Sequence, residues 1–400
     1  MIHVVGGTYL EQCREQRWCE LFGSGLRASL ALAEIQRNVQ FSTFIGGRQR
    51  GVLLAKSAKI QVHAIEAPQT VIFDYVHALA RPDIRPDDYA RGDGALRQSI
   101  DVKSDKVLRF GMVEGSAKVS ARMATYDPQS PTAPVNFEEN GSKADRLAVV
   151  ANRHEAERLT GKALATDACK AILKNGAEVA VVKCGAHGCV VATSKGISTV
   201  PAYRTKKVWP IGSGDVFSAL FANGWMEVGM SPKDAADRAS RGTSHFVETV
   251  LFPSRRDLGR KGFVPLKQLP VRKHKKVYLA GPFFNFAQRW LIEEFRSALR
   301  QANLKVFSPF HDVGRGEAQL IYDPDIKGLR ESGVVLACLD GLDPGTLYEI
   351  GYAHSLGLKV IAFVSGEHPE ALKMVVGGGS EITDDFTTAF YKTVWAATCE

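Results

Sequence analysis

Three carboxylates lie within ten residues of one another, directly after an unbroken apolar run. Asp340, Asp343 and Glu349 follow residues 334–339 (VVLACL), a pattern typical of a buried strand in a parallel sheet. Ligands of open α/β sheets bind outside the carboxyl ends of the strands, which is where these acids fall. Carboxylates crowded at such an edge indicate chemistry on a neutral or cationic small molecule.

The same residues also fit a purely structural interpretation. Thr346 and Glu349 have the spacing of a capping box. Asp343 followed by Pro344 fits the N-cap and first positions of a helix. The residues alone leave the catalytic and the capping interpretation open.

The elements around these acids alternate strand and helix. Residues 277–283 (VYLAGPF) predict a strand that ends in a Gly-Pro turn, followed by a helix over 286–300 and a strand over 305–307. A short helix begins near residue 322 and leads into the strand 334–339. This order, together with VYLAGPF and the pattern D-x-G-T-x-x-E that ends at Glu349, resembles the nucleoside 2-deoxyribosyltransferase family over roughly 275–365.

The resemblance implies a role for each matched position. Glu349 matches the nucleophile that attacks C1′ of the nucleoside, and Tyr278 matches the tyrosine that orients it. Asp343 matches an acid that contacts the base and helps to protonate it, and Asp325 matches a second acid at the base. The logic is that of a retaining glycosidase, with a covalent sugar intermediate that passes to a second base or to water. The residues expected to bind the substrate are Gly281, Pro282, Phe283, Asp340, Gly345 and Thr346.

A second motif lies in the N-terminal half. Residues 211–215 (IGSGD) form a small-residue loop that runs into a helix of apolar period. The backbone N–H groups of such a loop, added to the helix dipole, form an anion site. Asp215 at this position could take a proton from an attacking hydroxyl while the loop holds a phosphate. An aspartate near a helix start is also an ordinary capping choice.

Three further motifs accompany this loop. They are Asn152 with Glu155 after a strand, the tight turn 183–188 (KCGAHG) between two strands, and residues 126–128 (YDP) at a strand end. In this order they resemble the ribokinase-like (pfkB) sugar and nucleoside kinases over about 1–250. The resemblance implies ATP and Mg²⁺ as cofactors, Asp215 as catalytic base, and Asn152 with Glu155 near the magnesium and phosphate. The residues expected around the nucleotide are Gly212, Ser213, Gly214, Asn152, Glu155, Lys183, Gly185 and Gly188.

The chain departs from the pfkB pattern at two places. Trp209-Pro210 stands where the family has Asp-Thr, and residues 23–28 (GSGLRA) stand where it has Gly-Gly and an Asn. Glu11 is a weak candidate for the acid that grips the sugar. The residues expected to bind the phosphate therefore match the family pattern, whereas those expected to bind the sugar depart from it. Either the phosphate acceptor is unusual, or this half binds a nucleotide without turning it over.

Length and composition predict two domains of α/β class, each a doubly wound parallel sheet, because 400 residues exceed one ordinary core. The net charge of +8 resides between Arg255 and Lys276, which hold nine basic residues and one acid. We interpret this segment as a solvated linker rather than a nucleic-acid contact. The expected parts are a ribokinase-like domain (1–252), a basic linker (253–274) and a deoxyribosyltransferase-like domain (275–400).

The remaining features concern the cellular location and the partners of the protein. No apolar run approaches the roughly 20 residues that a membrane helix needs, and residues 1–7 read as a strand and turn rather than a signal peptide. Seven scattered cysteines without a C-x-x-C pair favour a reducing cytoplasm. By resemblance we expect a homo-oligomer that binds a small nucleoside or nucleotide, with no cofactor in the C-terminal domain and no nucleic-acid or membrane partner.

Three functions remain open on the sequence. The first is a bifunctional enzyme of nucleoside metabolism that cleaves an N-glycosidic bond and phosphorylates a nucleoside or its sugar. The second is an N-glycosidase whose kinase-like half only binds a nucleotide as a regulator. The third is a non-enzymatic nucleotide sensor in which Glu349 merely caps its helix. The base, the sugar and any 5′-phosphate of the substrate are not specified by these residues.

Overall fold

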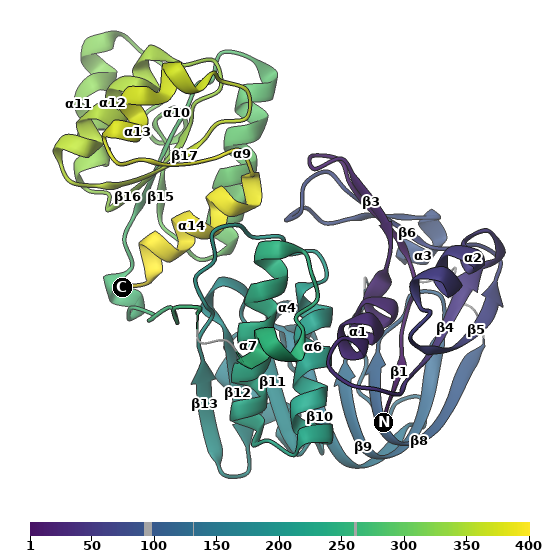
Figure 1. The fold of residues 1–400 in the computed structure, drawn as a ribbon. Helices are drawn as coiled ribbons and strands as arrows, with labels where there is room; N and C mark the ends of the chain where they lie inside the picture. Colours follow the sequence, from purple (N-terminus) through teal and green to yellow (C-terminus); the bar gives the residue numbers. More distant parts are fainter. Residues whose placement is uncertain (92–97, 131, 260–261) are drawn as a thin grey trace. The chain divides into compact units, whose positions relative to one another are not determined.

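Two α/β units make up the chain in the computed structural model, which describes residues 1–91, 98–130, 132–259 and 262–400. Unit 1 spans Met1–Pro265 and unit 2 spans Leu266–Glu400 (Figure 1). Unit 1 is built on a large, mostly parallel sheet, and unit 2 on a smaller sheet that is parallel throughout. The predicted α/β class with two parallel-sheet domains is confirmed.

The strands of unit 1 are β1 (Ile2–Val5), β2 (Leu10–Cys13), β3 (Trp18–Leu21), β4 (Val39–Gly46), β5 (Gln61–Ala67), β6 (Ile72–Tyr75), β7 (Asp83–Arg85), β8 (Ser99–Phe110), β9 (Ser116–Asp127), β10 (Lys143–Asn152), β11 (Val179–Lys183), β12 (Cys189–Thr193) and β13 (Gly196–Val200). Its helices are α1 (Gly23–Ala33), α2 (Gly47–Lys56), α3 (Asp87–Arg91), α4 (Arg153–Thr160), α5 (Ala165–Lys174), the 3-10 turn η1 (Gly185–His187), α6 (Ser213–Ala222), the π-helix η2 (Asn223–Val228), α7 (Pro232–Thr249) and α8 (Arg255–Gly259).

The main sheet of unit 1 has the order β13-β12-β11-β10-β9-β8-β1-β4-β5. Its strands run parallel except at β12 and β13, which continue the sheet as an antiparallel meander. A second sheet, of order β3-β2-β6-β7, was not predicted from the sequence. The run Val71-Ile-Phe73 predicts a strand that overlaps β6, but β2 and β3 are short and half-buried and carry no apolar run that would mark them.

The two longest strands of unit 1 bend back on themselves. β8 and β9 pair in parallel from Ser99↔Ser116 to Phe110↔Asp127, although only residues 111–115 connect them. Such a connection spans at most about 23 Å, whereas a straight strand of their 12 residues would be about 37 Å long. The register skips Asp105 and Arg122, which form an exposed ion pair at 2.7 Å, and we place the bend there. The bend returns the connection 111–115 to the carboxyl edge of the sheet.

Both faces of the main sheet are covered. Helices α1, α6 and α7 pack side by side on one face (Figure 1). On the other face, α5 packs beside the amino-terminal halves of β8 and β9, which contribute Ile100, Val102, Ala117 and Val119 to a second core. These half-strands alternate between buried and exposed residues because only one of their sides faces the sheet.

Unit 2 contains β14 (Val277–Ala280), α9 (Phe286–Gln301), β15 (Val306–Phe307), α10 (Pro309–Asp312), α11 (Ala318–Arg330), β16 (Val334–Cys338), α12 (Pro344–Ser355), β17 (Lys359–Phe363), α13 (Lys373–Gly377), β18 (Glu381–Thr383), α14 (Phe386–Thr398) and the 3-10 turns η3 (Val271–Lys273) and η4 (Pro369–Leu372). The parallel sheet has the order β15-β14-β16-β17-β18. Helices α9 and α14 pack together, and α11, α12 and α13 form a second layer. β14 and β16, the central strands around the candidate site, are buried along their whole length.

The division between the units falls at residues 265 and 266, inside the segment predicted as a basic linker. On the unit 1 side, α8 lies in this segment and Arg255 donates from Nε to the carbonyl of Ile35 (2.6 Å). On the unit 2 side, the backbone N–H groups of Leu269 and Lys275 donate to carbonyls at the end of α14. Each end of the segment is thus packed against its own unit.

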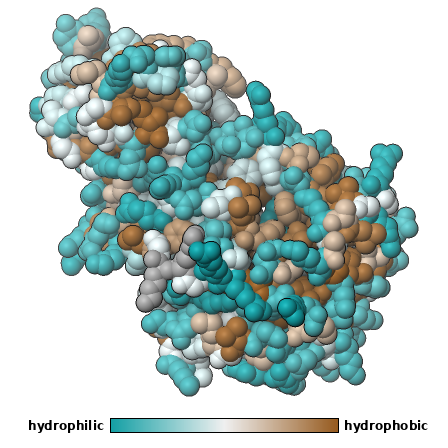
Figure 2. All heavy atoms as spheres, in the orientation of Figure 1, coloured by the Kyte–Doolittle hydropathy of each residue, from teal (hydrophilic) through white to brown (hydrophobic). Residues whose placement is uncertain are grey.

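Among the residues that the structure describes, no helix is both long and apolar enough to cross a bilayer. Hydrophilic residues cover much of the face drawn in Figure 2, interrupted by hydrophobic patches. In unit 2, Phe284 and Phe286 are 77% and 78% exposed.

Candidate functional site

The candidate site of unit 2 is built around Glu349 in the second turn of α12. Its Oε1 accepts a hydrogen bond from the hydroxyl of Tyr278 on β14 (2.6 Å). Tyr278 is fully buried, and its ring stacks on Phe307 of β15 at 5.4 Å between centroids. Tyr278 on β14, held by Phe307 on β15, therefore fixes the position of the Glu349 carboxylate.

The structure decides between the two capping interpretations of this helix. Asp343 is the N-cap of α12, and its Oδ2 accepts from the backbone N–H of Thr346 (2.7 Å) and from the Thr346 hydroxyl (2.8 Å). The capping box of Thr346 with Glu349 is wrong, because the helix begins at Pro344 and the Glu349 carboxylate is bonded to Tyr278 instead. Glu349 is not used to cap its helix.

Burial and neighbouring acids control protonation at this site. Burial raises the pKa of Glu349 to about 7; the Tyr278 hydrogen bond opposes this shift, while the charges of Asp325 and Asp343 add to it. Burial likewise raises the pKa of Asp325, on α11, to about 6. The Oδ1 atom of Asp325 is buried and has no hydrogen-bond partner among the described residues. The site thus holds carboxyl groups that carry or lose a proton close to neutral pH.

The other residues expected to bind the substrate have differing roles in the structure. Asp340 ties two loops together, since it accepts from the backbone N–H of Ser365 (2.7 Å), its hydroxyl (2.5 Å) and the N–H of Gly366 (3.2 Å). This carboxylate therefore has a structural role in joining the two loops. Gly345 lies beside the Asp343 carboxylate, in the first turn of α12.

An aromatic pair lies at the ends of β14 and β15. Gly281 packs so closely on α9 that a Cβ there would meet Ile292 at 2.6 Å. Pro282 and Phe283 follow, and the ring of Phe283 stacks on Phe310 at 4.7 Å with 15° between the planes. The sequence did not indicate Phe310, because the pairing depends on two loops that meet only in the folded sheet.

The pKa of Glu349 leads to a first testable prediction. Between the unfolded value of 4.5 and the folded value of about 7, the folded state binds more protons than the unfolded state. The free energy of unfolding therefore falls as the pH rises through this window, by up to about 3 kcal/mol. We expect Glu349→Gln to be more stable than the unmodified protein at pH 8 and equally stable near pH 5, in urea titrations. Glu317→Gln, at an exposed position, is the control; a difference that is the same at both pH values would contradict the prediction.

In unit 1, Asp215 lies in the first turn of α6, behind Gly212, which adopts a left-handed conformation (φ 77°). Its Oδ2 accepts from Nη1 of Arg27 on α1 (2.9 Å), and its Oδ1 accepts from Nε2 of Gln129 (2.7 Å). Both oxygens of the expected catalytic base thus have internal donors. Neither Arg27 nor Gln129 was among the expected site residues.

A second ionic cluster lies beside the first. Lys183 donates from Nζ to Oδ2 of Asp127 (2.6 Å), which also accepts from the hydroxyl of Ser218 (2.7 Å). Burial opposes the charge of Lys183, but Asp127 and Glu155 outweigh it and raise the pKa of the lysine. Burial and the charge of Asp127 raise the pKa of Glu155 to about 7. The expected nucleotide residues Lys183 and Glu155 are therefore coupled through Asp127.

These residues do not by themselves fit a magnesium ion. Asn152 and Glu155 form a capping box for α4, in which Asn152 Oδ1 accepts from the N–H of Glu155 (2.8 Å) and Glu155 Oε2 accepts from the N–H of Asn152 (2.7 Å). Lys183 already supplies the cation beside Asp127. No group of three or more His, Cys, Asp or Glu side chains that could hold a metal occurs in the described part of the chain. We derive no reaction step through magnesium.

The turn 183–188 connects two antiparallel strands, as predicted. Gly185 and Gly188 both have positive φ (56° and 83°), and a Cβ on Gly188 would meet the carbonyl oxygen of Val200 at 2.1 Å. Close approach of the backbone explains Gly188 without a ligand.

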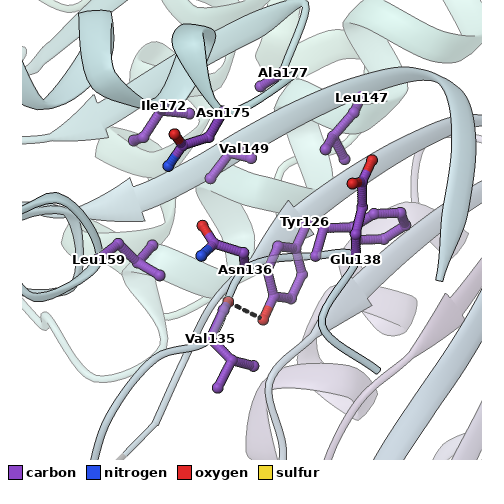
Figure 3. Close-up of a pocket in the computed structure, with 11 residues that line it drawn as sticks. Tyr126, Val135, Asn136, Glu138, Leu147, Val149, Leu159, Ile172, Asn175 and Ala177 are labelled. Atoms are coloured by element: carbon purple, nitrogen blue, oxygen red, sulfur yellow. Dashed lines mark hydrogen bonds between the residues drawn. The ribbon is translucent and has the colours of Figure 1, made fainter. Parts of the chain in front are cut away.

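A separate cavity in unit 1 contains none of the expected site residues. It lies beneath Tyr126, whose hydroxyl donates to the carbonyl of Val135 (2.9 Å), and Figure 3 shows aliphatic side chains from β10 and the α4–α5 layer around it. Buried Leu147, Val149 and Ile172 line one part of this cavity, and exposed Asn136, Glu138 and Asn175 line another, so it opens toward solvent.

Comparison with known proteins gives two matches to family models. Residues 122–249 match the pfkB family of carbohydrate kinases, and residues 277–383 match the nucleoside 2-deoxyribosyltransferases. Each unit thus matches an enzyme family. Both resemblances inferred from the sequence are confirmed at this level. Residues 1–121, where Glu11 and Arg27 lie, fall outside the matched kinase segment.

Three of the solved structures similar to the chain are kinases. A pyrophosphate-dependent kinase of the ribokinase family, complexed with a pyrophosphate analog and myo-inositol, is 16% identical, covering 64% of this chain and 99% of that one, with a TM-score of 0.44. Fructokinase from Vibrio cholerae O395 is 15% identical (64% and 97% covered, TM-score 0.47). Aminoimidazole riboside kinase from Salmonella enterica is 14% identical (64% and 98% covered, TM-score 0.47). No curated protein matches the chain.

Proposed function

We propose that unit 2 cleaves or transfers the N-glycosidic bond of a nucleoside or deoxynucleoside, or of its 5′-monophosphate, with Glu349 as nucleophile. The observation that carries this proposal is the Glu349–Tyr278 hydrogen bond at the carboxyl edge of a parallel sheet. A carboxylate that plays no part in capping its helix, and that the buried Tyr278 holds near Asp325, suits covalent catalysis. The match of residues 277–383 to the deoxyribosyltransferase model supports the same chemistry.

The reaction follows from the positions of these groups. A Glu349 carboxylate oxygen bonds to C1′ of the sugar while the bond from C1′ to the base nitrogen breaks, and its electron pair leaves with the base. In the second step a water oxygen or the nitrogen of a second base attacks C1′, and the bond to Glu349 breaks. The attacking group loses its proton to the same acid that assisted the first step, so the cycle balances.

In place of Asp343, to which the resemblance gave this role, we assign protonation of the departing base to Asp325. Its buried Oδ1 has no hydrogen-bond partner among the described residues, so this atom is open to an atom of the base, and burial raises the pKa of Asp325 to about 6. Asp343 has its Oδ2 committed to Thr346 and leaves one oxygen for contact with the base. The stacked Phe283 and Phe310 offer a flat apolar surface for a planar base.

Unit 1 admits two roles beside this chemistry. In one, it phosphorylates a nucleoside or sugar with ATP, using Asp215 as base and the loop Gly212–Gly214 as anion site. In the other, it binds a nucleotide as a regulator. The match of residues 122–249 to the pfkB model supports a kinase-like unit in either case. A cytoplasmic homo-oligomer remains part of the proposal, and the exposed Phe284 and Phe286 of unit 2 offer a surface for a second copy.

The test is to incubate the purified chain with nucleosides, deoxynucleosides and their 5′-monophosphates and to follow free base by chromatography. We expect base release from at least one class, with base exchange when a second base is added if the enzyme is a transferase. Release without exchange would assign a hydrolase. If no substrate in the panel yields free base or exchanges its base, the proposal is wrong.

A further inference from the structure

The space in front of helix α6 is filled by the side chain of Arg27. A Cβ built on Gly212 would meet Nε of Arg27 at 2.1 Å and its Cζ at 2.2 Å. The guanidinium therefore lies against the loop that was expected to hold a transferring phosphate. The side chain is only 2% exposed, so solvent does not separate it from the loop.

Arg27 also joins three elements of unit 1. Its Nη1 donates to Oε1 of Glu11 (3.1 Å) as well as to Asp215, and its Nη2 pairs with the other oxygen of Glu11. Glu11 lies on β2 of the four-stranded sheet and also accepts from the backbone N–H of Gly23 at the start of α1 (3.1 Å). The contact thus ties the small sheet to α1 and to the amino end of α6. All three side chains of this triad are less than 10% exposed.

The Asp215 carboxylate has both of its oxygens paired within this arrangement. Gln129 donates to Oδ1 and Arg27 to Oδ2, whereas a general base needs a free oxygen that reaches the hydroxyl of the acceptor. The loop itself is partly committed, because the N–H of Ser213 donates to the carbonyl of Pro210 (2.9 Å). A buried guanidinium with two carboxylate partners is held in place by bidentate, charge-assisted hydrogen bonds.

We propose that Arg27 is a permanent internal counter-ion that keeps unit 1 silent in phosphoryl transfer, and that Asp215 serves as a structural anion in the triad with Glu11. Arg27 occupies the place that the acceptor and the phosphate would share. Unit 1 then has a structural role, and the glycosyl transfer proposed for unit 2 is the reaction that the protein catalyses.

The test compares the full chain with Asp215→Asn in calorimetry and in ADP formation from ATP, with nucleosides and sugars as acceptors. If Asp215 is a structural anion, the variant should unfold at a temperature lower by roughly 5 °C, because Arg27 then keeps only one of its two carboxylate partners. A catalytic base predicts instead that the unmodified chain forms ADP above the protein-free background and that Asp215→Asn loses this activity. We expect the fall in unfolding temperature, and ADP formation that does not exceed the protein-free background for either protein.

Two further variants complete the test. Arg27→Met should lower the same transition by more than Asp215→Asn, because it leaves two buried carboxylates without their cation; if it does not fold, the Asp215→Asn comparison still decides. Asp105→Asn, in the exposed ion pair with Arg122, is the matched control and should shift the transition by less than about 2 °C. ADP formation that depends on Asp215, or an unfolding temperature that Asp215→Asn leaves unchanged or raises, would overturn the proposal.

Discussion

Replacing Glu349 with Gln should reduce base release by at least about 10³-fold, because the amide cannot form the bond to C1′. Gln has nearly the same shape and keeps an oxygen that can accept from the Tyr278 hydroxyl, as Oε1 of Glu349 does at 2.6 Å. The loss should therefore appear in kcat, with little change in substrate binding. The measurement is the initial rate of base release for the nucleoside that the unmodified chain cleaves best.

Chemical rescue separates a nucleophile from a residue that only shapes the site. In Glu349→Ala the space left by the side chain can admit azide or formate, and either anion can attack C1′ in its place. We expect partial recovery of base release and a sugar product of inverted configuration, because one displacement replaces two. Glu317→Gln, at an exposed position of the same unit, should keep full activity. A Glu349→Gln rate within tenfold of the unmodified rate would exclude the covalent step.

The sequence indicated where the acids of unit 2 gather, because polar residues that come directly after buried parallel strands meet at one edge of the sheet. The pairing of Glu349 with Tyr278, a residue inside β14, was expected only from the family resemblance, and the structure has that hydrogen bond. The uncertain part was the helix start, since Asp343 and Thr346 each fit a cap. That choice depends on which backbone N–H the carboxylate reaches, and sequence spacing does not contain this information.

In unit 1 the sequence indicated the loop 211–215 but not the side chains that contact it. Arg27 and Asp215 are separated by 188 residues, and their contact depends on how α1 packs against α6. The one available signal was the arginine in residues 23–28, where the resembling family has small residues and an asparagine. The sequence marked that departure, but only the structure shows that the guanidinium reaches Asp215.

The bend of β8 and β9 was invisible for a different reason. A strand that doubles back keeps the alternation of an ordinary strand, so no residue pattern marks the corner. Its consequence is Glu114, which the bend returns to the edge of the sheet, where it accepts from the hydroxyl of Tyr9 (2.7 Å). Burial raises the pKa of Glu114 to about 7, although nothing in the sequence around it suggests a buried acid.

Replacing Lys183 with Met should strongly destabilise unit 1. The side chain of Asp127 is fully buried and that of Lys183 is 14% exposed, so little water reaches the pair. Removing the lysine leaves Asp127 without its cation, and breaking a buried pair in this way costs about 3–5 kcal/mol. Its Oδ1 already has no partner among the described residues, so only Ser218 would remain to compensate the charge. The measurement is the free energy of unfolding at pH 8.

The pH dependence of this loss identifies its cause. Burial already raises the pKa of Asp127, with Lys183 opposing the shift, so removal of the lysine raises that pKa further. An acid whose pKa is higher in the folded state destabilises the fold as the pH rises, so the loss should be largest at pH 8 and smaller at pH 5. Asp127→Asn in the Lys183→Met background should recover part of the stability, because the buried charge is gone. Lys170→Met, whose pair with Asp167 is exposed, should cost at most about 0.5 kcal/mol. A loss that is independent of pH, and that the double variant does not recover, would mean that Lys183 stabilises through the packing of its methylene chain rather than through its charge.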